Sequence, residues 1–83
     1  MIKFYTLEEL EPTECVNILI KTKSKYLDRA GKARPFYYVV CPYKNTDNKW
    51  VFEEAAGELY ACWREWEIEG WCSLTDIEEN EIW

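Results

Sequence analysis

Hydrophobic and polar residues alternate along residues 15–24. Val16, Ile18 and Ile20 fall on one side of an extended chain, and Thr22 continues that side. The intervening positions become lysines toward the end of the stretch. A period of two is typical of a strand that buries one face and exposes the other to water. We therefore expect a strand here.

The longest apolar run of the chain, residues 36–41, predicts a second strand. These residues follow Pro35 and are all β-branched or aromatic except Cys41, a composition typical of a strand covered on both faces. We expect this strand to lie at the centre of a sheet. A polar turn over residues 45–49 then leads to a third strand that begins at Trp50. An antiparallel meander is the simplest topology for these three strands.

Local signals predict turns elsewhere. Residues 26–34 have Asp28 and Gly31 at turn positions and little apolar pattern, so we expect a basic hairpin loop. Two pairs of residues have the spacing of a capping box: Thr6 with Glu9, and Thr75 with Glu78. Each pair predicts a single helical turn.

The pattern after residue 54 fits either a helix or a strand. Five hydrophobic residues have the spacing of one helical face: Ala55, Leu59, Cys62, Trp63 and Trp66. This spacing favours a short helix, although Gly57 weakens it. The alternative is a strand with Leu59, Ala61 and Trp63 on one side.

The last predicted element covers residues 67–72, which are too few for a helix and include Gly70. An edge strand with a bulge fits them best. Together the patterns predict an α+β fold in a single domain, residues 1–83, with a three- to four-stranded antiparallel sheet and one short helix.

Composition argues against an enzyme. The chain has 83 residues, of which 48% are hydrophobic and 17% aromatic, so it is too apolar to be disordered. A chain of this size buries only about 60–65% of its unfolded surface, which leaves little material for a deep catalytic pocket. It contains no His to act as a general base or to activate a nucleophile. We expect a non-enzymatic protein with no cofactor.

The four cysteines, Cys15, Cys41, Cys62 and Cys72, show no zinc-binding spacing. Charged residues interrupt the first residues before a secretory signal could form. We therefore expect a cytoplasmic protein whose cysteines are reduced and buried in the core. No apolar run is long enough for a membrane helix.

Charge is distributed unevenly along the chain. The net charge is -6 overall, but residues 21–49 carry +6 and residues 50–83 carry -9. One interpretation is that Lys and Glu side chains pair across the sheet. The other is that the acidic third attracts a basic protein surface. Direct binding of nucleic acid is disfavoured because the acidic third would repel it, and a homo-oligomer remains open.

Five tryptophans are unusually many for a chain of this length. We expect Trp50, Trp63 and Trp71 to fill the core. Either Trp66, which is surrounded by charged residues, or the terminal Trp83 is expected to be exposed. An exposed Trp among charged residues is typical of interface centres. The predicted partner-binding residues are Glu58, Glu65, Trp66, Glu67, Glu69, Asp76, Glu78 and Glu79.

A second hypothesis uses the basic segment instead. In that case the protein sequesters a nucleotide-like anion, and its ligand-binding residues are Lys21, Lys23, Arg29, Lys32, Arg34 and Tyr37. The two hypotheses differ in which charges carry binding.

The chain also resembles a group of known proteins. The turn Leu7–Pro12, the aliphatic strand Val16–Ile20 and the motif Trp71-x-x-Leu74 are similar to those of small uncharacterised phage and prophage proteins. This sequence departs from them at Thr75, where a Pro is expected. The resemblance implies a phage setting, in the cytoplasm of a bacterial host cell. In that setting short acidic proteins block host defence proteins, sometimes as mimics of nucleic acid. It implies no particular functional residue.

Overall fold

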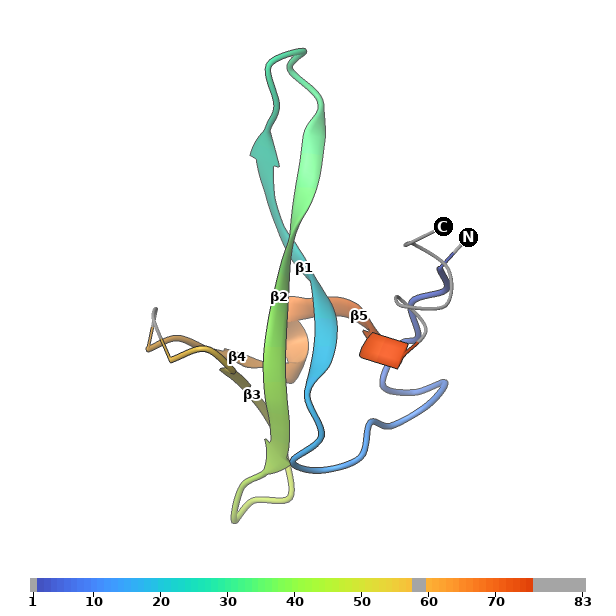
Figure 1. Ribbon diagram of the computed structural model, residues 1–83, viewed down its shortest axis with the longest axis vertical. Coiled ribbons are helices and arrows are strands. Elements are labelled where there is room, and N and C mark those ends of the chain that lie inside the picture. Colours follow the sequence, from blue (N-terminus) through green and yellow to red (C-terminus); the bar gives the residue numbers. More distant parts are fainter. Residues whose placement is uncertain (1, 58–59, 76–83) are drawn as a thin grey trace.

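The computed structural model describes residues 2–57 and 60–75, and these residues form a five-stranded antiparallel sheet (Figure 1). The strands are β1 (Ile18–Leu27), β2 (Ala33–Lys44), β3 (Trp50–Glu54), β4 (Cys62–Arg64) and β5 (Ile68–Ser73). Their order in the sheet is β4-β3-β2-β1-β5. A 3-10 turn, η1 (Glu65–Glu67), connects β4 to β5. The first four strands form a meander, and the chain then returns to place β5 beside β1.

One face of the sheet carries the core. Ile20, Val40 and Phe52 are fully buried there, and Trp71 is 7% exposed. The N-terminal segment covers part of this face, because Tyr5 and Leu7 pack against the core. Its backbone pairs with the edge of β5, where Tyr5 forms an antiparallel bridge with Trp71 through two hydrogen bonds of 2.8 and 2.9 Å. The indole N–H of Trp71 also donates to the carbonyl of Leu10 at 2.8 Å. The expected burial of Trp50 and Trp71 in the core is confirmed.

The N-terminal segment approaches β5 closely at Gly70. A Cβ atom at this position would lie 3.1 Å from both the Cβ of Phe4 and the carbonyl oxygen of Tyr5. Glycine therefore permits the close contact between the segment and the strand. The register shift between Lys21 and Thr22, opposite this part of β5, confirms the expected edge strand with an irregularity.

The opposite face of the sheet is open over the middle of β2, although Val51 and Cys72 are buried on the same face. β2 is the middle strand, as expected, but its prediction as a strand covered on both faces is wrong. Tyr37 is 50% exposed and Val39 is 41% exposed, although the ring of Phe4 lies 5.7 Å from that of Tyr37. Hydrophobic composition alone did not reveal which face packs.

The β1–β2 hairpin extends as an arm beyond the other strands (Figure 1). β5 pairs with β1 only as far as Thr22, where the register between β1 and β2 also shifts. A ladder of neighbouring rings runs along the arm to the core, with centroid separations of 5.1, 6.1 and 4.4 Å, through Tyr26, Phe36, Tyr38 and Trp63. The loop at the tip of the arm is shorter than the expected loop over residues 26–34, because Leu27 and Ala33 already pair as strand residues.

Polar turns close the β1–β2 and β2–β3 hairpins, as the sequence predicts. The carboxylate of Asp28 accepts hydrogen bonds from the backbone N–H groups of Ala30 and Lys32, each at 2.9 Å.

The expected capping box is also present at the N-terminus. The Thr6 N–H donates to Glu9 at 3.0 Å, and the Glu9 N–H donates to the Thr6 hydroxyl at 3.1 Å. The second expected capping box includes Glu78 and lies outside the described residues.

The predicted α+β fold is wrong, because the described residues form an all-β sheet with no helix of seven or more residues. The expected helix is interrupted by Gly57 and Tyr60, whose φ angles of 73° and 51° are left-handed. Trp63 instead lies on β4, where its ring stacks on Tyr38. The strand alternative agrees with β4, although Leu59 lies outside the described residues. No helix in the part of the chain that the structure describes could cross a bilayer.

Candidate functional site

Trp66 is the most prominent exposed side chain near the acidic residues. It lies in η1 and is 68% exposed, in agreement with the sequence-based expectation. Two hydrogen bonds hold the turn on either side of it. The Glu65 carboxylate accepts from the backbone N–H of Trp50 at 2.8 Å, and the Glu67 carboxylate accepts from that of Arg64 at 3.1 Å. The indole is thus presented to solvent from an anchored backbone.

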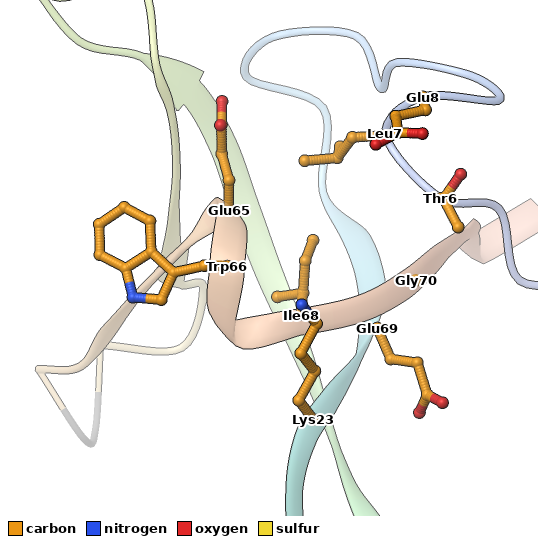
Figure 2. A pocket seen from close by; sticks show the side chains of 9 residues that line it. All are labelled: Thr6, Leu7, Glu8, Lys23, Glu65, Trp66, Ile68, Glu69 and Gly70. Atoms are coloured by element: carbon orange, nitrogen blue, oxygen red, sulfur yellow. The ribbon is translucent and has the colours of Figure 1, made fainter.

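An open groove of about 430 Å³ lies beside this turn. We call it the Trp66 groove. Figure 2 shows Leu7 and Ile68 on one side of η1 and the indole of Trp66 pointing to its other side. The lining residues come from the N-terminal turn, the arm, η1 and β5: Thr6, Leu7, Glu8, Lys23, Glu65, Trp66, Ile68, Glu69 and Gly70.

The charge of the groove is predominantly negative. Three carboxylates, those of Glu8, Glu65 and Glu69, line it together with one ammonium group, that of Lys23. Apolar side chains lie between these charged groups (Figure 2). A cationic group entering the groove would meet opposite charges around an apolar floor.

Glu69 is the most strongly paired of these acids. Its carboxylate lies 3.1 Å from the Lys25 ammonium and 3.9 Å from that of Lys21. The hydrogen bond from Lys25 holds the pKa of Glu69 below its usual value, with further lowering by nearby lysines. This pairing follows the cross-sheet interpretation of the charge pattern. Glu8 and Glu65 therefore contribute more of the groove's negative field than Glu69 does.

The structure brings together some of the predicted partner-binding residues. Glu65, Trp66 and Glu69 line the groove, whereas Glu67 is adjacent in the turn and bonds to Arg64. The remaining four lie outside the described residues: Glu58, Asp76, Glu78 and Glu79. Sequence reasoning missed Leu7 and Glu8, and it assigned Lys23 to the alternative anion site. The capping box at residues 6–9 was the only available signal in the sequence. It indicated a turn, but not that this turn lies beside the groove.

The residues of the alternative anion site do not converge. The Lys21 ammonium lies 5.6 Å from the centroid of the Phe4 ring and close to Glu69. The guanidinium of Arg34 is paired with Asp28 at 2.9 Å, and this hydrogen bond lowers the pKa of Asp28. Tyr37 lies on the open face of the sheet.

The remaining residues of that hypothesis are divided between two places. Lys23 lines the Trp66 groove, whereas Arg29 and Lys32 lie in the turn at the tip of the arm. The structure therefore does not gather the basic segment into one binding site.

The expectation that the cysteines are core residues is largely wrong. Only Cys72 is buried, whereas Cys41 is intermediate and both Cys15 and Cys62 are exposed. Within residues 2–57 and 60–75, no group of three or more His, Cys, Asp or Glu side chains is placed to hold a metal ion.

No protein-family model matches this chain, and neither a curated protein nor a solved structure is significantly similar to it.

Proposed function

We propose that this protein is a non-enzymatic binding protein that docks onto a basic surface of a partner protein through the Trp66 groove. The observation that carries the proposal is the 68% exposure of Trp66 on a turn that two hydrogen bonds anchor. Exposing a large aromatic ring to water is unfavourable, and such rings are typical of interface centres. Because the backbone of this turn is already held, binding costs little backbone conformational entropy.

The charges beside Trp66 select the kind of partner. A Lys or Arg side chain placed over the indole gains a cation–π interaction, which is stronger when water is excluded. The carboxylates of Glu8 and Glu65, both on the groove wall, attract the same cation. An Arg is favoured because its planar group both stacks on aromatic rings and pairs with carboxylates.

The sequence resemblance supplies the biological setting of the proposal. In a phage, the partner is a host protein, and docking blocks its activity. A host defence protein that handles nucleic acid is suitable, since its basic surface already binds phosphate groups. An acidic groove that binds this surface acts as a mimic of nucleic acid. The anion-sequestering alternative has less support, because its cations are paired or dispersed.

Charge reversal at the groove tests the proposal. Wild-type protein should capture a partner from bacterial lysate, and the capture should weaken as salt rises. Glu8→Lys should weaken association at low salt, whereas Lys23→Glu should strengthen it, because the two residues line the same groove with opposite charges. If Lys23→Glu abolishes binding, or if nucleotides raise the melting temperature of the protein, the anion-binding hypothesis replaces this one.

A further inference from the structure

Cys15 and Cys41 lie together although 26 residues separate them. The backbone N–H of Cys15 donates to the carbonyl oxygen of Pro42 at 2.8 Å. This bond holds the segment before β1 against β2 next to Cys41. The side chain of Cys15 lies near enough to the Cys41 thiol to raise its pKa.

The backbone at Cys15 has an unusual conformation. Its φ angle is 65°, in the left-handed region that residues other than glycine seldom adopt. Such a conformation persists where the surrounding structure holds it. Here the hydrogen bond to Pro42 holds the residue next to Cys41.

The two cysteines differ in their environment. Cys15 is exposed, so a small oxidant in solution reaches its sulfur, whereas Cys41 is only partly accessible. Burial raises the pKa of the Cys41 thiol, and the charge and hydrogen bond of Cys15 raise it further. Cys41 therefore keeps its proton while it lies beside Cys15. An exposed cysteine with a neighbouring thiol is the arrangement found in redox-sensitive pairs.

The sheet keeps the other two cysteines away from this pair. Glu53 lies opposite Cys41 on one side and opposite Cys62 on the other. Cys41 and Cys62 are thus two strands apart, about 10 Å at the usual strand spacing. A disulfide requires Cα atoms within about 7 Å. Cys72 is fully buried on β5, which is also two strands from β2.

We propose that Cys15 and Cys41 form a reversible intramolecular disulfide when the protein meets hydrogen peroxide. The Cys15 thiolate attacks one peroxide oxygen, the O–O bond breaks, and a sulfenic acid forms while the hydroxide released takes a proton to become water. The sulfur of Cys41 then attacks the sulfur of Cys15. The S–S bond forms, the S–O bond breaks, and the leaving hydroxide becomes a second water with the proton of Cys41. Two thiols are oxidised and one peroxide is reduced.

The disulfide has a structural consequence that is separate from the Trp66 groove. It closes a loop that contains β1 and the whole arm, and such cross-links stabilise by restricting the unfolded chain. Little native rearrangement is needed, because the backbone of Cys15 is already hydrogen-bonded to that of Pro42, the residue next to Cys41. Since Cys41 lies opposite Glu53 in the β2–β3 pairing and none of the three residues Cys15, Cys41 or Glu53 lines the groove, this inference stands independently of the proposed function.

Peroxide treatment of the reduced full-length protein tests the inference. After one equivalent of hydrogen peroxide and alkylation of the remaining thiols, peptide mapping without reductant should find Cys15 joined to Cys41. The oxidised protein should melt at a higher temperature than the reduced protein, and dithiothreitol should reverse the shift.

Serine variants identify the reacting pair. Cys15→Ser and Cys41→Ser should each abolish the disulfide, whereas Cys62→Ser, which removes another exposed cysteine, should leave it intact. The inference is overturned if the wild-type protein links Cys15 to another cysteine, forms only intermolecular disulfides, or accumulates sulfinic acid at Cys15 without a disulfide.

Discussion

The carboxylate of Glu65 accepts a hydrogen bond from the backbone N–H of Trp50 at 2.8 Å, and this bond links η1 to the start of β3. The acid therefore stabilises the turn that presents Trp66, in addition to contributing negative charge to the groove. A partner meets an indole whose backbone is already held in position.

Removing the Glu65 acceptor should destabilise the protein. Glu65→Ala leaves the partly buried N–H of Trp50 without its partner, and we expect a loss of about 1–3 kcal/mol in the free energy of unfolding. Glu65→Gln keeps an oxygen acceptor and should lose less. Urea unfolding of the two variants and the wild type measures the difference. Equal losses would show that the negative charge, and not the hydrogen bond, stabilises this turn.

Thr22 should be essential to the register shift at the base of the arm. Its hydroxyl donates to the carbonyl of Ser24 at 2.9 Å and accepts from the N–H of Phe36 at 3.1 Å, while the residue is only 2% exposed. Thr22→Val keeps the shape but leaves both backbone groups unpaired, so we expect a loss of about 1–3 kcal/mol. Thr22→Ser retains the hydroxyl and is the matched control. Urea unfolding that finds the two variants equally stable would contradict this role.

Two neighbouring residues of β2 should respond differently to a charge. Val40 is fully buried in the core, whereas Val39 is 41% exposed on the open face. Val40→Asp places an unpaired carboxylate in the core and should abolish cooperative unfolding. Val39→Asp should retain a cooperative transition. Circular dichroism during heating distinguishes them, and similar melting of both variants would show that the core lies elsewhere.

Acid should weaken the fold through three carboxylates whose pKa values lie below their usual range. The causes are the backbone hydrogen bond of Thr6 for Glu9, the Arg34 hydrogen bond for Asp28 and the Lys25 hydrogen bond for Glu69. Below about pH 4, the unfolded chain takes up protons that the folded chain still lacks. Stability is therefore fully present above that pH and is lost as pH falls through the lowered pKa values.

Asp28→Asn tests one of these three contributions. An Asn oxygen still accepts from the turn N–H groups, but the side chain no longer titrates. The variant should lose less stability than the wild type between about pH 4 and pH 2. Urea midpoints measured across this interval provide the comparison. Identical slopes for the two proteins would contradict the assignment to Asp28.

The strands of the middle of the chain were predictable because their signals are local. Ile18 and Ile20 alternate with residues of the other face, and the β-branched run that includes Val40 lies within the central strand. The helix was mispredicted because Trp63 and Trp66 have helical spacing by coincidence. They belong to a short strand and a 3-10 turn, and Gly57 was the local sign of a break.

The groove was only partly predictable. Trp66 was identified by its charged neighbours, but Leu7 and Glu8 reach the groove through the pairing of Tyr5 with Trp71, two residues far apart in sequence. No local pattern specifies such a pairing.

The acidic residues of η1 and β5 are also less available to a partner than the sequence implied. Glu65, Glu67 and Glu69 each have an intramolecular partner. Reversing these three charges would disturb the turn as well as the field. Glu8 and Lys23 are therefore better positions for testing charge alone.

The central claim is that the exposed ring of Trp66 carries binding to a basic partner. The most direct measurement is the dissociation constant of the complex with a partner whose binding weakens as salt rises. Isothermal titration calorimetry determines it for the wild type, Trp66→Ala and Tyr60→Ala. Tyr60 is the matched control, since it is an aromatic residue that is 93% exposed and lies outside the groove. We expect Trp66→Ala to weaken binding by about 30-fold, which corresponds to roughly 2 kcal/mol, and Tyr60→Ala to leave it nearly unchanged. Equal affinity of the wild type and Trp66→Ala would contradict the claim.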